Sequence, residues 1–133
     1  MSDLVFLDSN ILLYLESPDT AKAMQAFMLL QAGGVISVQV LNEFASVAVR
    51  KFAIPIPEIR LTLRSVRQVC TVQSLDIETH ELGLNITERY RFDIYDSLIV
   101  ASALRAGCTT LYTEDLQHGQ VIDGLTIRNP FIS

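Results

Sequence analysis

The chain has 133 residues, with 10 Lys and Arg against 15 Asp and Glu and a formal net charge of -5 at pH 7. Half of the residues are hydrophobic, and a chain of this length buries about two-thirds of the surface that its unfolded form exposes. These values exclude intrinsic disorder as the main state, and the scattered 6 Gly and 4 Pro exclude a collagen-like or low-complexity chain. We therefore expect a single globular domain over residues 1–133.

The first half of the chain alternates short apolar runs with helical periodicity. The run from Leu4 to Leu7 has the composition of a buried central strand, and it ends at Asp8. The next expected elements are a helical turn over residues 11–15, a helix over 21–32, a strand over 35–37 and a helix over 38–51. On the helix over 21–32, we expect Ala23, Phe27 and Leu30 to form the buried face.

The second half of the chain continues the alternation after Pro55 and Pro57. The expected elements are a helix over residues 58–69, a strand over 71–74, a helix over 77–91, a helix over 93–105 that Gly107 closes, and strands over 110–113 and 125–128. Strands that alternate with helices predict an α/β fold, here a three-layer α/β/α sandwich with a central parallel sheet. In such sheets, ligands bind beyond the carboxyl ends of the strands.

Residues 23–42 carry no charge, but we do not expect them to span a membrane, because three Gln residues and Gly33-Gly34 interrupt the stretch. The N-terminus has no basic segment before its first apolar run, and that run is too short for the core of a signal peptide. We therefore expect a cytoplasmic protein. Cys70 and Cys108 fit no Cys-x-x-Cys pattern and are expected to be small buried hydrophobic residues.

Four acidic residues lie directly against apolar sequence, where a free charge is unfavourable. They are Asp8, Glu43, Asp96 and Asp115. Acids are almost never fully buried unless they are paired, and the chain has only two lysines, neither of them beside these acids in the sequence. An external cation is therefore the natural partner.

Each of these acids except Glu43 also has a structural alternative. Asp8 and Asp115 are at positions where they could cap a following turn or short helix, and Asp96 could belong to a capping box that Asp93 opens. Glu43 lies inside an amphipathic helix and needs a partner if it faces inward. Four acids at one edge of a sheet favour a functional site over four separate structural roles.

A cluster of carboxylates predicts a divalent cation, because like charges at short range repel one another unless a cation neutralises them. A donor set made only of oxygen favours Mg²⁺ or Mn²⁺, which bind phosphate oxygens readily. The chemistry that follows is the hydrolysis of phosphodiester bonds. Zinc is disfavoured, because His80 and His118 have no His or Cys partner at ligand spacing.

The four acids stand in segments that resemble the motifs of PIN-domain ribonucleases and, among these, of the VapC-type toxins of type II toxin-antitoxin pairs. The resemblance runs along the whole chain. The matching segments are Phe6–Leu12, Asn42–Phe44, Tyr95–Ala101 and Leu111–Leu116, and the ending Asn129–Phe131 is similar to one subgroup. One such motif is common, but four in this order are specific.

The resemblance implies a metal-dependent endoribonuclease. Its implied catalytic and Mg²⁺- or Mn²⁺-binding residues are Asp8, Glu43, Asp96 and Asp115. Ser9, Asn10 and Thr113 are implied to orient these acids, and Asp93 is a further candidate whose role as a helix N-cap is favoured. The resemblance also implies RNA cleavage that leaves a 5′-phosphate, a homodimer and a cognate antitoxin protein that covers the site.

Rival functions are weaker. A phosphoacceptor receiver domain needs a lysine near a late strand, whereas Lys51 is the last lysine, and a haloacid-dehalogenase-type phosphatase needs a second Asp where Asn10 stands. The remaining alternative is a catalytically idle, metal-binding PIN-like module that acts through protein-protein contact.

The acidic balance disfavours a broad basic face for RNA. Arg60, Arg64 and Arg67 form a basic stripe on one expected helix. This stripe could follow a phosphate backbone, but an ordinary solvated helix face is slightly favoured.

Overall fold

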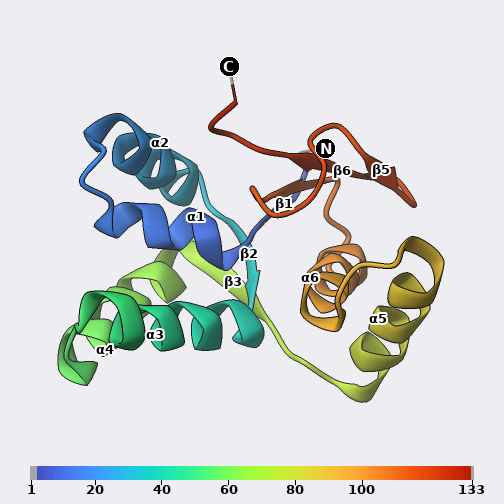
Figure 1. The fold of residues 1–133 in the computed structure, drawn as a ribbon, viewed down its shortest axis with the longest axis horizontal. Coiled ribbons are helices and arrows are strands. Elements are labelled where there is room, and N and C mark those ends of the chain that lie inside the picture. Colours follow the sequence, from blue (N-terminus) through green and yellow to red (C-terminus); the bar gives the residue numbers. More distant parts are fainter. Residues whose placement is uncertain (1–2, 133) are drawn as a thin grey trace.

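Within residues 3–132, which the computed structural model describes, six strands form one sheet (Figure 1). The strands are Val5–Leu7 (β1), Gly34–Ser37 (β2), Cys70–Gln73 (β3), Thr110–Tyr112 (β4), Val121–Ile122 (β5) and Leu125–Arg128 (β6). Their order is β3-β2-β1-β4-β6-β5, and neighbours are parallel except for β5, which is antiparallel to β6. The predicted domain limits at residues 1 and 133 lie outside the described residues.

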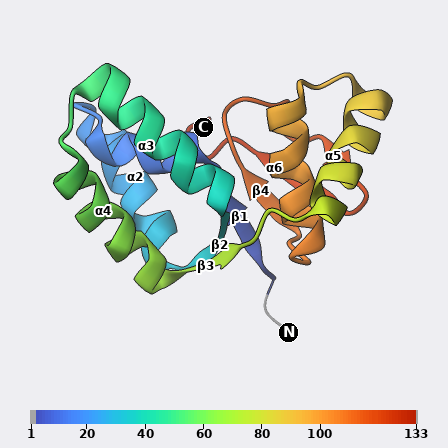
Figure 2. The same cartoon turned by 90° about the horizontal axis from the view of Figure 1, so that it is seen from below.

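Helices cover both faces of the sheet. They are Ser9–Leu13 (α1), Thr20–Gln31 (α2), Val38–Phe52 (α3), Ile56–Val69 (α4), Ile77–Tyr90 (α5) and Ile94–Arg105 (α6), and a short 3-10 helix, Tyr14–Glu16 (η1), follows α1. Figure 2 shows α1 to α4 on one side of the strands and α5 with α6 on the other. The predicted three-layer α/β/α sandwich is confirmed, with β5 as an antiparallel addition at the edge of the sheet.

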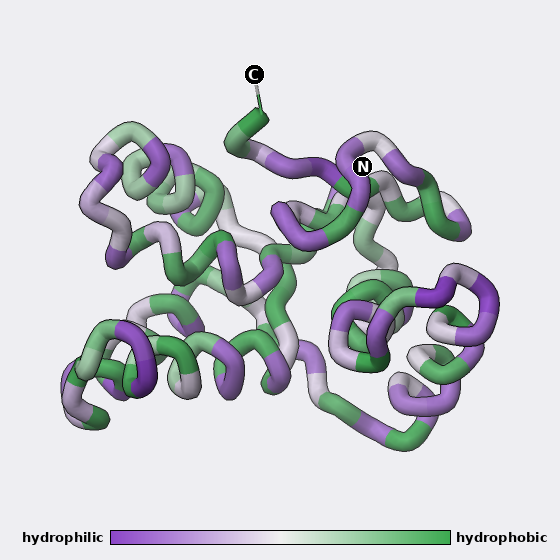
Figure 3. Tube along the Cα trace, viewed as in Figure 1, coloured by the Kyte–Doolittle hydropathy of each residue, from purple (hydrophilic) through white to green (hydrophobic). Residues whose placement is uncertain are grey.

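The core lies between these layers. Phe6, Leu7, Leu111 and Ile127 of the central strands are fully buried, because helices cover both faces of a parallel sheet. Figure 3 shows hydrophobic residues along the central strands and hydrophilic residues on the outer turns of the helices. Cys70 and Cys108 are buried free thiols, as predicted.

The small residues of α6 allow it to pack closely. Ser97, Ala101 and Ala103 are fully buried. At the contact with α5, a Cβ added to Gly83 would lie 2.7 Å from the Cδ2 atom of Leu98. This close contact holds the N-terminus of α6, with its two acids, at one position beside the sheet.

Two predictions of local structure are wrong. Leu30 is buried as predicted, but Phe27 is 48% exposed, because α2 turns Ala26 and not Phe27 toward the core. Apolar residues surround much of α2, so their spacing does not single out one face. The strand β5 is absent from the predicted elements, because two residues are too few to show a period.

The uncharged stretch over residues 23–42 contains most of α2, the strand β2 and the start of α3. Gly33 turns the chain between α2 and β2 with a φ of 84°, a conformation that favours glycine. Among residues 3–132, no helix is long and apolar enough to cross a membrane.

Candidate active site

The sheet order brings two predicted acids to the same edge. Asp8 follows β1 directly, and Asp115 lies three residues beyond β4. The strands β1 and β4 are parallel neighbours with Leu7 opposite Tyr112, and the backbone N–H of Asp8 donates to the carbonyl of Tyr112 at 3.1 Å. The carboxyl ends of these two strands therefore carry Asp8 and Asp115 side by side, as the topology of a parallel sheet requires.

Asp8 is the deepest of the four acids, with 4% of its surface exposed. Its Oδ1 accepts from the backbone N–H of Ser9 at 2.7 Å, and its Oδ2 accepts from the hydroxyl of Thr113 at 2.8 Å. Burial, with a smaller contribution from the charges of Glu43 and Asp115, raises the pKa of Asp8 to about 7 despite these two hydrogen bonds. The carboxylate is thus held in one orientation, and it forms no ion pair within residues 3–132.

Asn10 and Thr113 connect Asp8 to Asp115. The amide nitrogen of Asn10 donates to Thr113 Oγ1 at 3.2 Å and to Asp115 Oδ2 at 3.1 Å. The backbone N–H of Asp115 also donates to Thr113 Oγ1, at 3.1 Å. One threonine hydroxyl therefore contacts three residues of the site. The structure places Asn10 and Thr113 where they can orient the acids, which is the role that the resemblance implies.

Glu43 reaches the site from α3. Its Oε1 accepts from the hydroxyl of Ser9 at 3.1 Å, and the same hydroxyl lies 3.5 Å from Asp8 Oδ1. Ser9 thereby bridges two of the four acids. The sequence analysis required a partner for an inward-facing Glu43. In the structure, neutral hydrogen-bond donors, among them the hydroxyl of Ser9, take that role.

Gln39 is a residue of the site that the sequence analysis did not identify. Its amide nitrogen donates to Glu43 Oε2 at 3.4 Å and to the backbone carbonyl of Tyr95 at 3.0 Å, so it ties α3 to the first turn of α6. Gln39 precedes Glu43 by four residues, a spacing that places both side chains on one face of a helix. That spacing could have identified it, although the contact with Tyr95 depends on the tertiary fold.

Asp96 and Asp93 lie at the N-terminus of α6. Asp93 is the N-cap, and its Oδ1 accepts from the backbone N–H of Asp96 at 2.9 Å. The favoured N-cap role of Asp93 is therefore confirmed. Asp96 is half-buried, and burial first, then the charges of Asp93, Asp115 and Glu43, raise its pKa to about 6. Asp96 is thus close enough to feel the other acids electrostatically.

The other acidic and histidine residues have separate partners. Glu114 accepts from the hydroxyl of Tyr14 at 2.8 Å and is thereby directed away from Asp115. His80 and His118 are exposed, and His118 Nδ1 accepts from the backbone N–H of Asn129 at 2.9 Å. Within residues 3–132, the ion pairs do not include any of the four predicted acids.

A cleft of about 310 Å³ opens over two of the predicted acids, Glu43 and Asp115, and two of the predicted orienting residues, Ser9 and Asn10. Its lining residues are Ser9, Asn10, Leu13, Glu43, Ser46, Val47, Arg50 and Asp115. Asp8 does not line the cleft itself, but it is hydrogen-bonded to Ser9, which does, and to Thr113. Asp96 is not among the lining residues.

The donor chemistry fits a hard divalent cation. All four acids and Asn10 offer oxygen, and Asn10 Oδ1 is buried with no hydrogen-bond partner among the described residues. In the same region, burial first and then the charges of neighbouring acids raise the pKa of Asp8 and Asp96. Within residues 3–132, however, no three His, Cys, Asp or Glu side chains are already arranged as a metal-binding set. The side chains would have to adjust to bind an ion together.

Comparison with known proteins adds a family match. The family model described as PIN domain matches residues 5–122. No curated protein sequence matches the chain.

Solved structures are similar in fold at low sequence identity. The Mycobacterium tuberculosis toxin VapC20, described as cleaving the sarcin-ricin loop, is 18% identical with a TM-score of 0.68, over 84% of this chain and 89% of that chain. A toxin-antitoxin complex from Klebsiella pneumoniae is 20% identical with a TM-score of 0.70, over 96% and 98% of the two chains. DNA-bound VapBC from Salmonella typhimurium is 20% identical with a TM-score of 0.65, over 97% and 99%.

Proposed function

The chain belongs to the PIN domain family, and from this premise we propose that it is a metal-dependent endoribonuclease and the toxin of a toxin-antitoxin pair. The observation that carries the proposal is the buried carboxylate of Asp8, which lies near further acids and forms no ion pair within residues 3–132. A structural acid in this position would be expected to have a basic partner. A cation-binding acid needs none from the protein.

We propose that Asp8, Glu43, Asp96 and Asp115 hold Mg²⁺ or Mn²⁺. When bound, the ion supplies charge to polarise a phosphate oxygen and to lower the pKa of a water nucleophile. The family match and the oxygen-only donors support this assignment. Because Asp8 and Asp96 have raised pKa values, the ion competes with protons for these two acids, and its affinity rises with pH.

The neighbouring residues act through the acids. Thr113 and the backbone N–H of Ser9 hold Asp8 in one orientation. The hydroxyl of Ser9 orients Glu43, and the amide of Asn10 orients Asp115. Such contacts fix donor atoms in advance, so less conformational entropy is lost when an ion and an RNA phosphate bind.

The proposed partners are an RNA substrate, a cognate antitoxin protein and a second copy of the chain. The structures from Klebsiella pneumoniae and Salmonella typhimurium are described as a toxin-antitoxin complex and as a DNA-bound VapBC complex. Their similarity extends along nearly the whole of this chain, which supports the same kind of assembly.

The test is cleavage of total host RNA by purified protein free of antitoxin, with Mg²⁺ or Mn²⁺ and with EDTA. We expect cleavage with metal, none with EDTA, and a loss of at least about 100-fold in Asp8→Asn and Asp96→Asn. Glu88→Gln, an exposed acid on α5, is the matched control and should cut like the unaltered chain. Metal binding without any cleavage would instead support the catalytically idle module.

A further inference from the structure

A second cavity adjoins the cleft over the acids. It has a volume of about 320 Å³ and lies between α1, η1 and the C-terminal part of α3. Its lining residues are Asn10, Leu13, Tyr14, Ser17, Pro18, Val47, Lys51, Phe52 and Glu114. Asn10, Leu13 and Val47 line both cavities, which are therefore adjacent, and we call the two together the groove. A volume of this size is at the lower end of the range for small-molecule sites.

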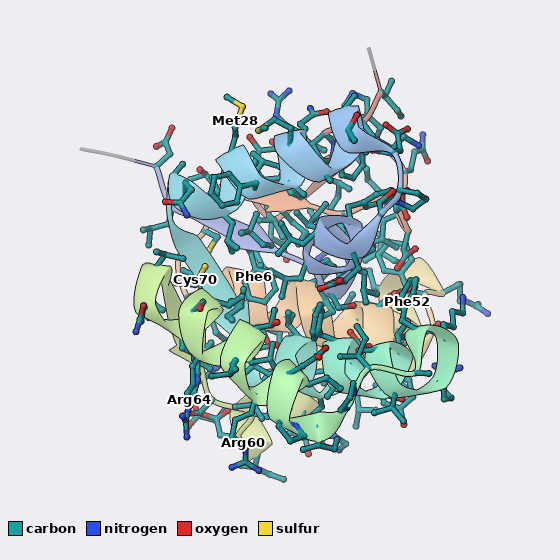
Figure 4. All side chains as sticks on the ribbon, turned by 90° about the vertical axis from the view of Figure 1, so that its left-hand side faces the viewer. Phe6, Met28, Phe52, Arg60, Arg64 and Cys70 are labelled. Carbon is teal, nitrogen blue, oxygen red and sulfur yellow. The ribbon has the colours of Figure 1, made fainter. Side chains whose placement is uncertain are left out.

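The walls of this cavity are apolar and partly aromatic. Phe52, the last residue of α3, is 45% exposed, and Figure 4 shows it at the edge of the molecule. The ring of Tyr14 packs against Phe131 with centroids 4.3 Å apart, and its hydroxyl donates to Glu114 at 2.8 Å. These two contacts hold the Tyr14 ring in place, whereas the Phe52 side chain is partly exposed to solvent and is available to a ligand.

Two cations lie along the same groove. Arg50 lines the cleft over the acids, and Lys51 lines the second cavity. Both are exposed and neither forms an ion pair within residues 3–132. Arg50 follows Glu43 by seven residues, which places it about 10 Å further along α3. Positive charge near a helix C-terminus also stabilises the helix dipole, but that role does not explain an exposed aromatic ring beside it.

We propose that this groove is a nucleotide subsite, in which a base of the substrate strand stacks on Phe52 and a neighbouring phosphate binds Arg50 and Lys51. The proposal rests on the proposed ribonuclease function and names how its substrate is held. The base and not the phosphate lies beside Glu114, because the carboxylate of that residue repels an anion. The substrate is a single strand, since only an unpaired base can leave its neighbours and stack on a side chain.

The arginine stripe of α4 does not belong to this groove. Arg60, Arg64 and Arg67 are exposed and line neither cavity. Figure 4 shows Arg60 and Arg64 on the outer side of α4, away from Phe52. Arg64→Gln therefore removes the same charge as Lys51→Gln at a comparable exposed position, and it serves as the matched control.

The experiment measures binding of a short oligoadenylate, by fluorescence anisotropy in EDTA, so that no cleavage occurs. We expect Lys51→Gln to weaken binding and to reduce the slope of log Kd against log salt by about 0.7. We expect Phe52→Leu to weaken binding by about 5-fold or more, because stacking on an aromatic ring contributes that much per base. Arg64→Gln should change neither quantity. Thermal unfolding of each variant verifies that it is folded.

An abasic strand of the same length separates stacking from general contact. Phe52→Leu should leave the affinity for the abasic strand unchanged, while Lys51→Gln should still weaken it. An equal effect of Phe52→Leu on both strands, or an effect of Arg64→Gln as large as that of Lys51→Gln, would overturn the subsite. So would tight RNA binding that neither groove variant alters.

Cleavage assays distinguish the subsite from the proposed function. If the protein cuts RNA but Phe52→Leu and Lys51→Gln leave KM unchanged, the subsite is wrong and the ribonuclease function stands. If the protein binds oligoadenylate through Phe52 and Lys51 but cuts no RNA, the subsite stands and the catalytic function fails. Absence of RNA binding overturns the subsite. That result would favour an apolar peptide side chain as the occupant of the groove.

Discussion

The carboxyl group of Asp8 combines burial with acidity, and this combination affects folding as well as metal binding. Burial raises its pKa from 3.8 to about 7, so between these pH values the folded chain binds a proton that the unfolded chain has lost. This group therefore makes the protein less stable as the pH rises through that interval. The full loss of folding stability is present above pH 7, the approximate pKa of Asp8 in the folded chain.

Asp8→Asn should remove this cost, because the amide is neutral and still accepts a hydrogen bond from Ser9. In EDTA at pH 8, we expect the free energy of unfolding to rise by roughly 2 to 4 kcal/mol. At pH 4 the change should be close to zero. Urea unfolding at both pH values measures the difference, with Glu88→Gln as the control. A gain of equal size at both pH values would contradict the prediction.

Thr113 contributes to the site through three neighbours. Its hydroxyl donates to Asp8, and it accepts from Asn10 and from the backbone N–H of Asp115. Thr113→Val keeps the shape but removes all three contacts, so we expect Mn²⁺ affinity to fall by about 10- to 100-fold. Thr113→Ser should restore most of it. Calorimetric titration with Mn²⁺ makes the comparison, and equal affinities of the Val and Ser variants would exclude this positioning role.

At the scale of single elements, the N-terminus of α6 separates a structural acid from a proposed metal-binding acid. Asp93 caps the helix, whereas the side chain of Asp96 is free to face the other acids. Adjacent acids with different roles are difficult to distinguish by charge alone. Their hydrogen bonds distinguish them, because only the cap accepts from a backbone N–H of the first turn.

Substitution of Asp93 tests this assignment. Asp93→Ala removes the cap and should lower the free energy of unfolding by about 1 kcal/mol. Asp93→Ser keeps a capping oxygen without the charge and should restore that stability. Both variants should lower the pKa of Asp96, because the charge of Asp93 contributes to its increase. Thermal unfolding and NMR titration of the Asp96 carboxyl measure the two effects. A large loss of stability in the Ser variant would mean that the charge itself is needed.

At the scale of the whole molecule, the proposed ion would connect four elements that are distant in the sequence. Asp8 follows β1, Glu43 belongs to α3, Asp96 to α6, and Asp115 follows β4. A ligand that binds only the folded chain stabilises the entire fold, by about 2.7 kcal/mol at a concentration of 100 times its Kd. The unfolded chain cannot hold these acids together, so the effect belongs to the tertiary structure.

We therefore expect saturating Mn²⁺ to raise the Tm of the unaltered chain by several degrees at pH 8 and by much less at pH 5. The acids with pKa values near 7 and 6 must lose their protons before they bind the ion. Asp8→Asn should abolish the increase, while Glu88→Gln should retain it. Differential scanning calorimetry measures the shift. An equal increase at both pH values would point to binding at exposed acids elsewhere.

Much of the fold was predictable, because apolar residues in the local sequence recur with the period of a helix, about 3.6 residues, or of a strand, about 2 residues. The strand at β1, the helix that Asp93 begins and the parallel three-layer arrangement follow from apolar runs, capping residues and their alternation. The orientation of Phe27 was not predictable from spacing, because α2 is apolar around most of its surface and only its neighbours decide which side is buried. The two residues of β5 depend in the same way on pairing with β6.

The sequence by itself identified the four acids that we propose carry the chemistry, which stand at strand ends and helix faces in the order of a known family. Only the tertiary structure decided how they are connected. The hydrogen bonds of Asn10 to Asp115, of Gln39 to Tyr95 and of Thr113 to Asp8 join residues that are 105, 56 and 105 positions apart. The groove that leads from the acids to Phe52 likewise exists only where α1 packs beside α3. Local patterns extend over one helix turn or one strand, whereas a site of this kind depends on contacts between elements that the sheet order alone brings together.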